Sequence, residues 1–389
     1  MDAADEGSYR TAMAEVDFLI VGSGIAGASA AAFLSSEARV AVIERESAHG
    51  YHTTGRSAAL YSPIYGSAAF RALTVASRPF FDDSPPGFAA HPLLRDRGVL
   101  YIGREDQRAS LEREAAGATT VGMAVDWLTP DEAIGICPVL RREALAAAFL
   151  EPTGMDIDVE AMHQGYLRLA RAQGAQILLH AELVALDRSR DRWRARLANG
   201  ETLDAGVVID AAGAWADQVA ALAGVAPIGL TPMRRTAFII DPPEGLDVTR
   251  WPAVIDADED FYFKPEAGKL LVSPADETPS EPCDAWAEDM VIAECVERMQ
   301  QAADLPVRRI NRSWAGLRTF APDRDPVIGY EPGAEGFFWL AGQGGYGVQS
   351  SAGAGRTAAA LALGRPAPED VRALGLIEAQ IGPARLRGV

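Results

Sequence analysis

Three glycines and one carboxylate near the start of the chain have the spacing of a dinucleotide-binding site. Residues 17–27 read DFLIVGSGIAG and residues 40–44 read VAVIE. Gly22 allows a tight turn, Gly24 lets the backbone approach a pyrophosphate, and Gly27 lets a helix pack closely on a strand. Glu44 ends a second strand where a ribose would lie, and its carboxylate would accept hydroxyl hydrogen bonds and repel a 2′-phosphate. The pattern therefore predicts dinucleotide binding and argues against NADP.

The elements around these residues decide between binding and a merely structural turn. An apolar run before Gly22 predicts a buried strand, and the small residues after Gly24 predict a helix. The N-terminus of that helix would face the phosphates with free N–H groups and the positive end of its dipole. A lone G-x-G-x-x-G is weak evidence, and a structural Gly-rich turn is the alternative. Here strand, helix, spacing and acid agree, so we favour dinucleotide binding.

The composition is that of a soluble globular protein with about two domains. The chain has 389 residues, of which 48% are hydrophobic and 23% charged. Its net charge of −18 argues against a nucleic-acid partner, because phosphate binding needs a basic surface. Cys137, Cys283 and Cys295 lack metal-ligand spacing and predict reduced thiols in a cytoplasmic protein, without disulfides or a metal site. No apolar run approaches the roughly 20 residues of a transmembrane helix.

Two patterns indicate that a second domain interrupts the cofactor domain. Between residues 233 and 275, short apolar runs separated by Pro, Asp and Gly predict an antiparallel sheet. Residues 336–341 (GFFWLA) predict a strand that leads into the Gly-rich segment 342–347 and an Ala-rich helix at 351–363. This second strand–turn–helix unit lies near the C-terminus, far from the first. The cofactor domain is therefore predicted to be discontinuous, with the sheet-rich segment inserted in it.

Further motifs carry a resemblance to a known family. They are TGRS at 54–57, AAGAW at 211–215, WAGLRTF at 314–320 and GQGGYGV at 342–348. With the first fingerprint, they resemble the FAD-dependent D-amino-acid oxidase-like (DAO) family, which also contains glycine and sarcosine oxidases. Within it, GYHTTGRSAA at 50–59, MHQGY at 162–166 and FYFKP at 261–265 look most like the D-arginine dehydrogenase branch.

The resemblance implies an α/β fold with noncovalently bound FAD. A discontinuous Rossmann-like FAD-binding domain would comprise residues 16–90, 145–232 and 325–389. An inserted α+β substrate-binding domain, built on an antiparallel sheet, would comprise residues 91–144 and 233–324. Residues 1–15 are predicted to be a disordered leader.

The same resemblance implies roles at the reaction centre. Arg318 would pair with the substrate carboxylate through its planar fork, with a surface arginine as the alternative. Tyr262 would donate its hydroxyl to the same carboxylate, and Tyr65 resembles a lid over the substrate. Arg235 would face the pocket and Arg234 the surface, although the two could exchange places. The residues expected at the reaction centre are Arg318, Tyr262, Tyr65, Arg235 and Gly345.

The remaining matched residues would hold FAD. N–H groups of the loop at 54–60 would serve the flavin oxygens and the pyrophosphate, and those at 344–349 would stabilise negative charge on the reduced flavin. Arg45 would cover the adenine, with a solvated arginine as the alternative, and Leu183 would bind adenine through its backbone. The predicted cofactor-binding residues are Gly22, Gly24, Ala26, Gly27, Glu44, Arg45, Thr53, Thr54, Gly55, Arg56, Ser57, Ala58, Ala59, Leu60, Leu183, Ala212, Gly213, Trp215, Gly344, Gly345, Tyr346, Gly347, Val348 and Gln349.

The activity that the resemblance implies is oxidative deamination of a D-amino acid, with hydride transfer from Cα to flavin N5. Val99 stands where arginine-preferring relatives carry a carboxylate, and Leu60 where they carry a histidine. We therefore expect a substrate with an uncharged side chain, and these changes favour an apolar one. Lys264 and Lys269 are the only lysines of the chain. Relatives of the sarcosine type place a lysine over the flavin, and we expect Lys269 at the surface instead. We predict a dehydrogenase that passes electrons to a quinone or another carrier.

Two alternatives remain open at this point. A glycine- or sarcosine-type secondary-amine oxidase that uses oxygen shares almost every motif above. A protein of another class, a flavin-binding subunit of a larger complex, would use the acidic surface for a partner. The sequence does not fix the oligomeric state.

Overall fold

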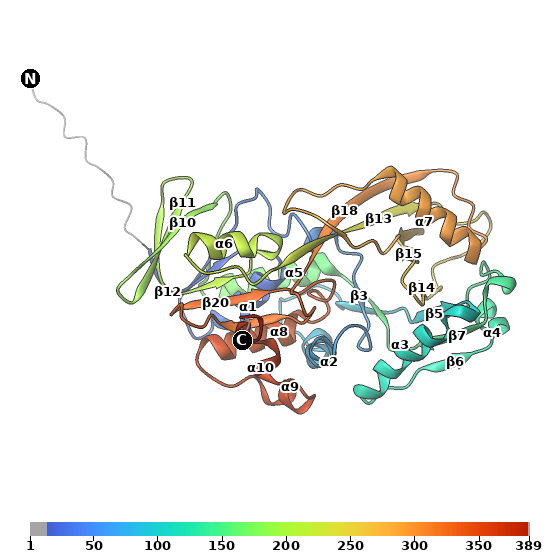
Figure 1. Ribbon diagram of the computed structural model, residues 1–389, viewed down its shortest axis with the longest axis horizontal. Coiled ribbons are helices and arrows are strands. Elements are labelled where there is room, and N and C mark those ends of the chain that lie inside the picture. The colour runs from blue at the N-terminus through green and yellow to red at the C-terminus, as the bar shows by residue number, and fades with distance from the viewer. Residues whose placement is uncertain (1–13, 388–389) are drawn as a thin grey trace, which may run out of the picture.

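The structure is a computed structural model that describes residues 14–387. Its strands form two large sheets and one small sheet, and Figure 1 shows the two large sheets in opposite halves of an elongated molecule. Most of the predicted leader, residues 1–13, lies outside the described residues. Residues 14 and 15 differ from the prediction, because they already belong to the first strand, β1 (Ala14–Val21).

The first large sheet is parallel at its centre. β1 lies between β2 (Val40–Ile43) and β12 (Thr202–Asp210), while β9 (Gln176–Leu178) pairs with β2 and β20 (Phe337–Ala341) with the end of β12. Three antiparallel strands complete the sheet: β10 (Leu183–Ser189), β11 (Arg192–Leu197) and β19 (Val327–Tyr330). Because β1, β2, β12 and β20 run in one direction, the turns that follow them meet at one edge, where open α/β sheets bind ligands.

Helices rich in small residues cover one face of this sheet. α1 (Ile25–Leu34) packs against α8 (Ser351–Ala362) and α5 (Val159–Ala172), and α8 also contacts α2 (Ala68–Asp82). Their alanines share one core with the sheet, which lets the helices approach it closely. The other face is covered by α6 (Ala216–Leu222), which packs beside the β10–β11 hairpin. Two short helices near the C-terminus, α9 (Glu369–Ala373) and α10 (Glu378–Ile381), follow α8.

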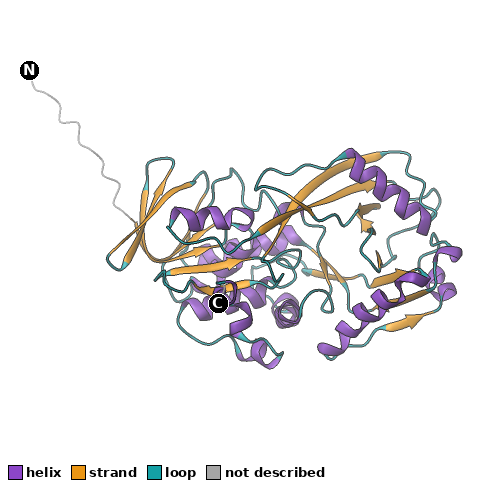
Figure 2. Cartoon of the chain, in the orientation of Figure 1, coloured by secondary structure: helices purple, strands orange, loops and turns teal. Residues whose placement is uncertain are grey.

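The second large sheet is antiparallel except where β14 and β5 pair in parallel. Its strands are β5 (Val99–Gly103), β6 (Asp126–Leu128), β7 (Ala147–Glu151), β13 (Thr231–Ile240), β14 (Ala253–Asp256), β15 (Tyr262–Glu266), β16 (Lys269–Ser273), β17 (Thr278–Pro279) and β18 (Ile310–Phe320). α7 (Asp289–Ala302) and α4 (Pro130–Ile136) bury apolar residues against the sheet, and α3 (Arg108–Thr120) packs on β5 and β7. Figure 2 shows these helices on the outside of the second sheet.

The junction of the two halves contains the small sheet. It consists of β3 (Leu60–Tyr61), β4 (Leu94–Asp96) and β8 (Met155–Ile157), all antiparallel. Single helical turns also occur: η1 (Thr54–Arg56), η2 (Glu105–Gln107), η3 (Arg142–Ala144), η4 (Gly213–Trp215) and η5 (Pro383–Leu386). The predicted α/β class is confirmed. A domain boundary at residue 145 is wrong for β7, because that strand pairs with β5 and β6 of the second sheet. Within residues 14–387, no helix is long and apolar enough to cross a membrane.

Candidate functional site

Two adjoining cavities lie where the halves of the molecule meet. The larger cavity follows the ends of β1, β2 and β12 and continues to β13, β15 and β18 of the second sheet. The smaller cavity adjoins it between the loop after η1, β15 and β18. Residues of the two cavities therefore form one continuous site. The residues that line both are Ser57, Ala58, Arg235, Tyr262, Arg318, Gly345 and Val348.

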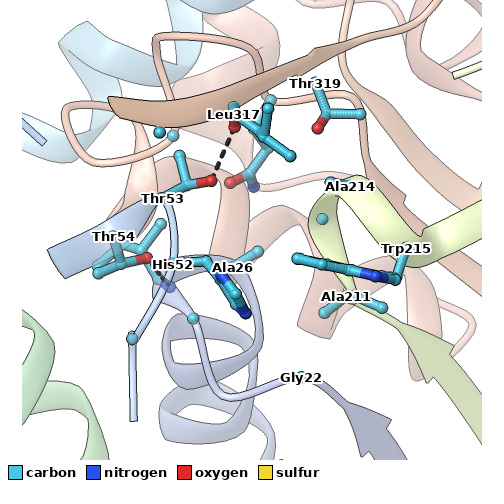
Figure 3. Close-up of a pocket in the computed structure, with 18 of the residues that line it drawn as sticks. Gly22, Ala26, His52, Thr53, Thr54, Ala211, Ala214, Trp215, Leu317 and Thr319 are labelled. Carbon is cyan, nitrogen blue, oxygen red and sulfur yellow. Dashed lines mark hydrogen bonds between the residues drawn. The ribbon is translucent and has the colours of Figure 1, made fainter. Parts of the chain in front are cut away.

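The turn between β1 and α1 forms one wall of the larger cavity. Gly22 has a φ of +102°, and a Cβ there would lie 2.6 Å from the carbonyl oxygen of Ala211. The N-cap residue of α1, Gly24, has no side-chain cap. The N–H of Ile25 is already satisfied, since it donates to Thr54 Oγ1 at 2.9 Å, a bond drawn in Figure 3. Gly24 and Ala26 line the cavity, so the start of α1 presents backbone to it.

Glu44 closes the next part of the wall, directly after β2. Its Oε2 accepts hydrogen bonds from the backbone N–H and the hydroxyl of Ser23, both at 2.9 Å. Its Oε1 accepts from the N–H of Glu46 at 3.1 Å. A carboxylate has about four acceptor positions, so Glu44 keeps about one for a ligand in the cavity.

A cluster of aromatic and charged side chains lies beside Glu44. The guanidinium carbon of Arg45 is 4.1 Å from the centre of the Trp215 ring. The centres of the His52 and Trp215 rings are 4.6 Å apart. Figure 3 shows His52 and Trp215 lining the same pocket, together with Gly22 and Ala26. Arg45 is therefore held against Trp215 and is not a freely solvated arginine. Leu183, Ala212 and Gly213 line the cavity here as well.

The loop from residue 53 to 60 differs in part from its predicted role. The N–H groups of Gly55, Arg56 and Ser57 donate to Gly50, Thr53 and Thr54, because the chain forms a helical turn there. These three N–H groups are therefore not available to a ligand. Thr53 donates its hydroxyl to the carbonyl of Leu317 at 2.7 Å, as Figure 3 shows.

Arg56 ties this loop to the second sheet. Its guanidinium donates to the carbonyl oxygens of Ala285 and Ala315 at 2.8 and 2.9 Å, and it pairs with Asp284. Its side chain thus fixes the loop through protein contacts, although Arg56 also lines the cavity. Sequence patterns alone do not reveal these long-range contacts.

The Gly-rich turn before α8 forms the opposite wall. The N–H of Gly344 donates to Thr319 and that of Tyr346 to Gln343, so these two differ from the expected free donors. Within residues 14–387, the N–H groups of Gly345, Gly347 and Val348 have no hydrogen-bond partner. α8 begins only at Ser351, so the turn itself, not the first helical turn, faces the cavity.

Arg318 stands at the junction of the two cavities. It lies on β18, and among the described residues its guanidinium has neither a hydrogen bond nor a salt bridge. Burial alone would lower the pKa of Arg318, but Tyr65, Tyr262 and Glu259 around it raise the pKa above its usual value. This half-buried, unpaired cation is therefore placed to bind an anion.

Arg235, by contrast, already has carboxylate partners. Its side chain is 7% exposed, its Nη2 lies 3.2 Å from Glu277 and its Nη1 lies 3.9 Å from Glu259. Arg234 points elsewhere and pairs with Glu288. Arg235 lines both cavities and Arg234 neither. Arg235 therefore shapes the charge of the wall, while Arg318 is the arginine left free.

The two predicted tyrosines occupy different parts of the smaller cavity. Tyr262 faces both cavities, because Phe261 and Phe263 on either side of it turn into the core of the second sheet. The hydroxyl of Tyr65 donates to Glu259 at 3.3 Å, and its ring lies 4.9 Å from that of Tyr346. Burial raises the pKa of Tyr65 well above its usual value, so the phenol stays protonated as a donor.

Glu259 is the acidic residue of the smaller cavity that sequence reasoning missed. It lies in the turn between β14 and β15 with a φ of +58°. No motif marks it, and it adds a carboxylate to a pocket that the changes at Val99 and Leu60 were expected to make more apolar. Leu60, Ala59 and Gln349 line this cavity as well, whereas Val99 is buried outside both cavities.

Several predicted or considered residues line neither cavity. Gly27 packs α1 on the first turn, Gly55 donates to Gly50, and the Tyr346 ring lies 4.3 Å from that of Phe70. Both lysines are also outside: Lys264 pairs with Asp156 and Glu266, and Lys269 with Asp241. Within the described residues, no group of His, Cys, Asp and Glu side chains suits a metal ion.

The chain is similar to known proteins over most of its length. Residues 17–361 match the family model described as DAO, FAD dependent oxidoreductase. Glycine oxidase of Geobacillus kaustophilus (strain HTA426) is 26% identical over 348 residues, covering 84% of this chain and 87% of that protein. L-2-hydroxyglutarate dehydrogenase of Salmonella houtenae is 29% identical over 242 residues, covering 58% of this chain and 54% of that protein. The crystal structure of the Geobacillus glycine oxidase has the same fold, with a TM-score of 0.82 at 21% identity and coverage of 97% of this chain and 100% of that chain.

Proposed function

Because the chain belongs to the DAO family of FAD-dependent oxidoreductases, we propose that it oxidises the Cα–N bond of an amino acid. The proposed substrate is a D-amino acid, the substrate class of the family branch that the sequence motifs resemble, and its side chain is uncharged. Its oxidation yields an imino acid, which hydrolyses in water. The single observation that carries the proposal is the unpaired guanidinium of Arg318 where the two cavities join.

The residues of the larger cavity fit FAD. Backbone at Gly24 and Ala26 suits the pyrophosphate, the free acceptor position of Glu44 suits a ribose hydroxyl, and the Arg45–Trp215 pair covers the adenine end. The unpaired N–H groups of Gly345, Gly347 and Val348 suit the flavin end, next to Arg318. When bound, FAD supplies the acceptor for the hydride that leaves Cα.

The protein residues orient the substrate for this transfer. Arg318 would hold the carboxylate through two parallel hydrogen bonds, and the Tyr262 hydroxyl would donate to the same group. Fixing the carboxylate fixes the direction of the Cα–H bond, which is the main requirement of the reaction. Tyr65, bonded to Glu259, would cover the smaller cavity and exclude water.

The environment of the smaller cavity supports an uncharged substrate side chain. Leu60, Ile255 and Val348 supply apolar surface, while Glu259 is engaged by Tyr65 and lies near Arg235. A substrate cation would have to compete with these partners for Glu259. The similarity to glycine oxidase supports a second candidate, a secondary-amine oxidase of the glycine or sarcosine type.

We further propose that the electrons pass to a quinone or another carrier and not to oxygen. Both lysines are paired with carboxylates outside the cavities, so neither supplies a cation over the flavin.

We also propose the division into a discontinuous FAD-binding domain and an inserted substrate-binding domain, with the boundary near 145 moved beyond β7.

The test is a substrate panel under anaerobic conditions, in which loss of the yellow absorbance reports reduction of FAD. D- and L-amino acids, glycine, sarcosine and 2-hydroxyglutarate are compared at equal concentrations. We expect D-methionine, D-leucine or D-phenylalanine to reduce FAD fastest. Fastest reduction by D-arginine, by an L-amino acid or by 2-hydroxyglutarate contradicts the proposal, and fastest reduction by glycine or sarcosine selects the second candidate. Peroxide formed in air as fast as a dye acceptor is reduced would contradict the dehydrogenase assignment.

A further inference from the structure

A chain of hydrogen bonds reaches Glu44 through Ser23 and His49, which do not line the cavity. Nδ1 of His49 lies 2.9 Å from the hydroxyl oxygen of Ser23, which in turn donates to Glu44 at 2.9 Å. On its other side, Nε2 of His49 lies 2.9 Å from Nη2 of Arg171, which belongs to α5. This hydrogen-bond chain therefore runs from α5, in the first half of the molecule, to the Glu44 carboxylate that faces the cavity.

In this hydrogen-bond chain, every donor points along the direction from Arg171 to Glu44. A guanidinium has no acceptor, so Arg171 must donate and Nε2 of His49 must accept. The proton of the neutral imidazole is then on Nδ1, which donates to the oxygen of Ser23. The hydroxyl proton of Ser23 is left to donate to Glu44. Each bond fixes the direction of the next, and Glu44 remains an acceptor only.

We propose that His49 is a positioning residue for the cofactor, which holds Glu44 toward the FAD ribose through the hydroxyl of Ser23. His49 lies in the loop after β2. Ser23 lies between Gly22 and Gly24, in the turn from β1 to α1. The inference depends on FAD as the cofactor and on Glu44 as its ribose ligand. It does not depend on the substrate proposed above.

The surroundings of His49 favour its neutral form. Burial, the charge of Arg171 and the neighbouring His163 lower the pKa of His49, against the opposing effect of Glu44. Protonation would turn Nε2 into a donor that faces the donor of Arg171, so the first bond of the chain would break. The same protonation would place two positive charges together.

His163 supports the same turn in a different way. Its Nε2 donates to the carbonyl oxygen of Ser23 at 2.7 Å, and burial lowers the pKa of His163. Protonation of His163 at Nδ1 leaves this bond in place, because Nε2 is already the donor. The break that acidification makes in this hydrogen-bond chain, at the Arg171–His49 bond, is therefore assigned to His49.

The experiment measures the dissociation constant of FAD for the apoprotein by recovery of flavin fluorescence, a readout independent of turnover. His49→Ala and Ser23→Ala are each expected to weaken FAD binding about tenfold near neutral pH. The double variant is expected to bind FAD as the Ser23→Ala variant does, because both residues act through one bond to Glu44. His91→Ala is the matched control, since His91 is an exposed histidine paired with Asp158, and it should bind FAD as the wild type does.

A conservative variant separates positioning from folding. His49→Asn keeps an amide donor for Ser23 but does not titrate, so its affinity should lie within about threefold of the wild type. As the pH falls from neutral to mildly acidic, the wild type should lose affinity more steeply than His49→Asn. Circular dichroism of each apoprotein checks that it is folded.

Three outcomes would overturn the proposal. The first is wild-type affinity in His49→Ala, and the second is multiplication of the two single effects in the double variant. The third is the same pH dependence in the wild type and in His49→Asn. If no variant and no wild-type protein bound FAD, the cofactor assignment itself would fail, which is a different result from any of these three.

Discussion

The guanidinium of Arg318 packs directly on Gly345. A Cβ at position 345 would lie 2.6 Å from Nη1 of Arg318 and 2.7 Å from its central carbon. The Gly-rich turn before α8 therefore leaves just enough room for the arginine that faces both cavities. This contact links the flavin end of the larger cavity to the proposed carboxylate site.

Gly345→Ala should displace Arg318 without emptying the cofactor site. We expect kcat/KM to fall at least about 100-fold, because the carboxylate would lose its paired hydrogen bonds. FAD content, measured by absorbance, should stay at the wild-type level. A variant with unchanged kcat/KM would show that the position of Arg318 does not matter to the reaction.

Tyr65→Phe should weaken substrate binding while leaving the fold intact. The hydroxyl of Tyr65 donates to Glu259 at 3.3 Å, and its loss removes the bond that holds the ring against the smaller cavity. We expect KM to rise about fivefold, in line with one lost hydrogen bond to a charged group. Tyr330→Phe is the control, because the Tyr330 hydroxyl donates to Ala362 away from both cavities. Equal KM values for the two variants would contradict a lid role for Tyr65.

Glu151 should make stability depend on pH. Burial raises the pKa of Glu151 to about 7, against the bonds from Ser62, Ile64 and Thr153 that lower it. The pKa of Glu151 in the folded state lies above its value in the unfolded state. At pH values between the two pKa values, the unfolded state therefore binds fewer protons than the folded state. Stability consequently falls as the pH rises through this range. The wild type should lose at most about 3 kcal/mol there relative to Glu151→Gln. Chemical denaturation at several pH values measures this, and parallel curves for the two proteins would contradict the assignment.

Gly27→Ala should disrupt the first half of the molecule. A Cβ at position 27 would lie 1.9 Å from the carbonyl oxygen of Gly22, which is backbone and cannot rotate away. We expect a loss of about 3 kcal/mol or more in unfolding free energy, together with loss of FAD. Gly135→Ala on α4 is the control, since nothing lies within 4 Å of its Cβ position and alanine favours the helix. Equal thermal stability of both variants would rule out the close contact.

Short-range patterns in the sequence predicted much of the fold. The run before Gly22, the glycine spacing and Glu44 specify β1, α1 and β2, because each depends on neighbours in the chain. The face of Tyr262 needed the structure, since alternation along β15 allows either face until the core position of Phe263 is known. Arg318 was found through a family motif and not from its chemistry alone.

Long-range contacts could not be predicted. Glu259 reaches the smaller cavity from a turn with positive φ that no motif marks. The chain from Arg171 through His49 to Ser23 joins three separate segments, and only the fold brings them together. The sequence predicts that the N–H groups of Gly55, Arg56 and Gly344 are free for a ligand. In the structure, local turns and the carbonyl of Thr319 accept their hydrogen bonds. Tertiary hydrogen bonds thus decide which predicted donors remain for a ligand.

The most direct test of the proposed function is the anaerobic reduction of bound FAD by a D-amino acid in the wild type and in Arg318→Met. If Arg318 binds the substrate carboxylate, both proteins will bind FAD equally, and the variant will need at least about 100-fold more substrate for half-maximal reduction. If the two proteins reduce FAD at the same rate and the same substrate concentration, Arg318 does not hold the substrate.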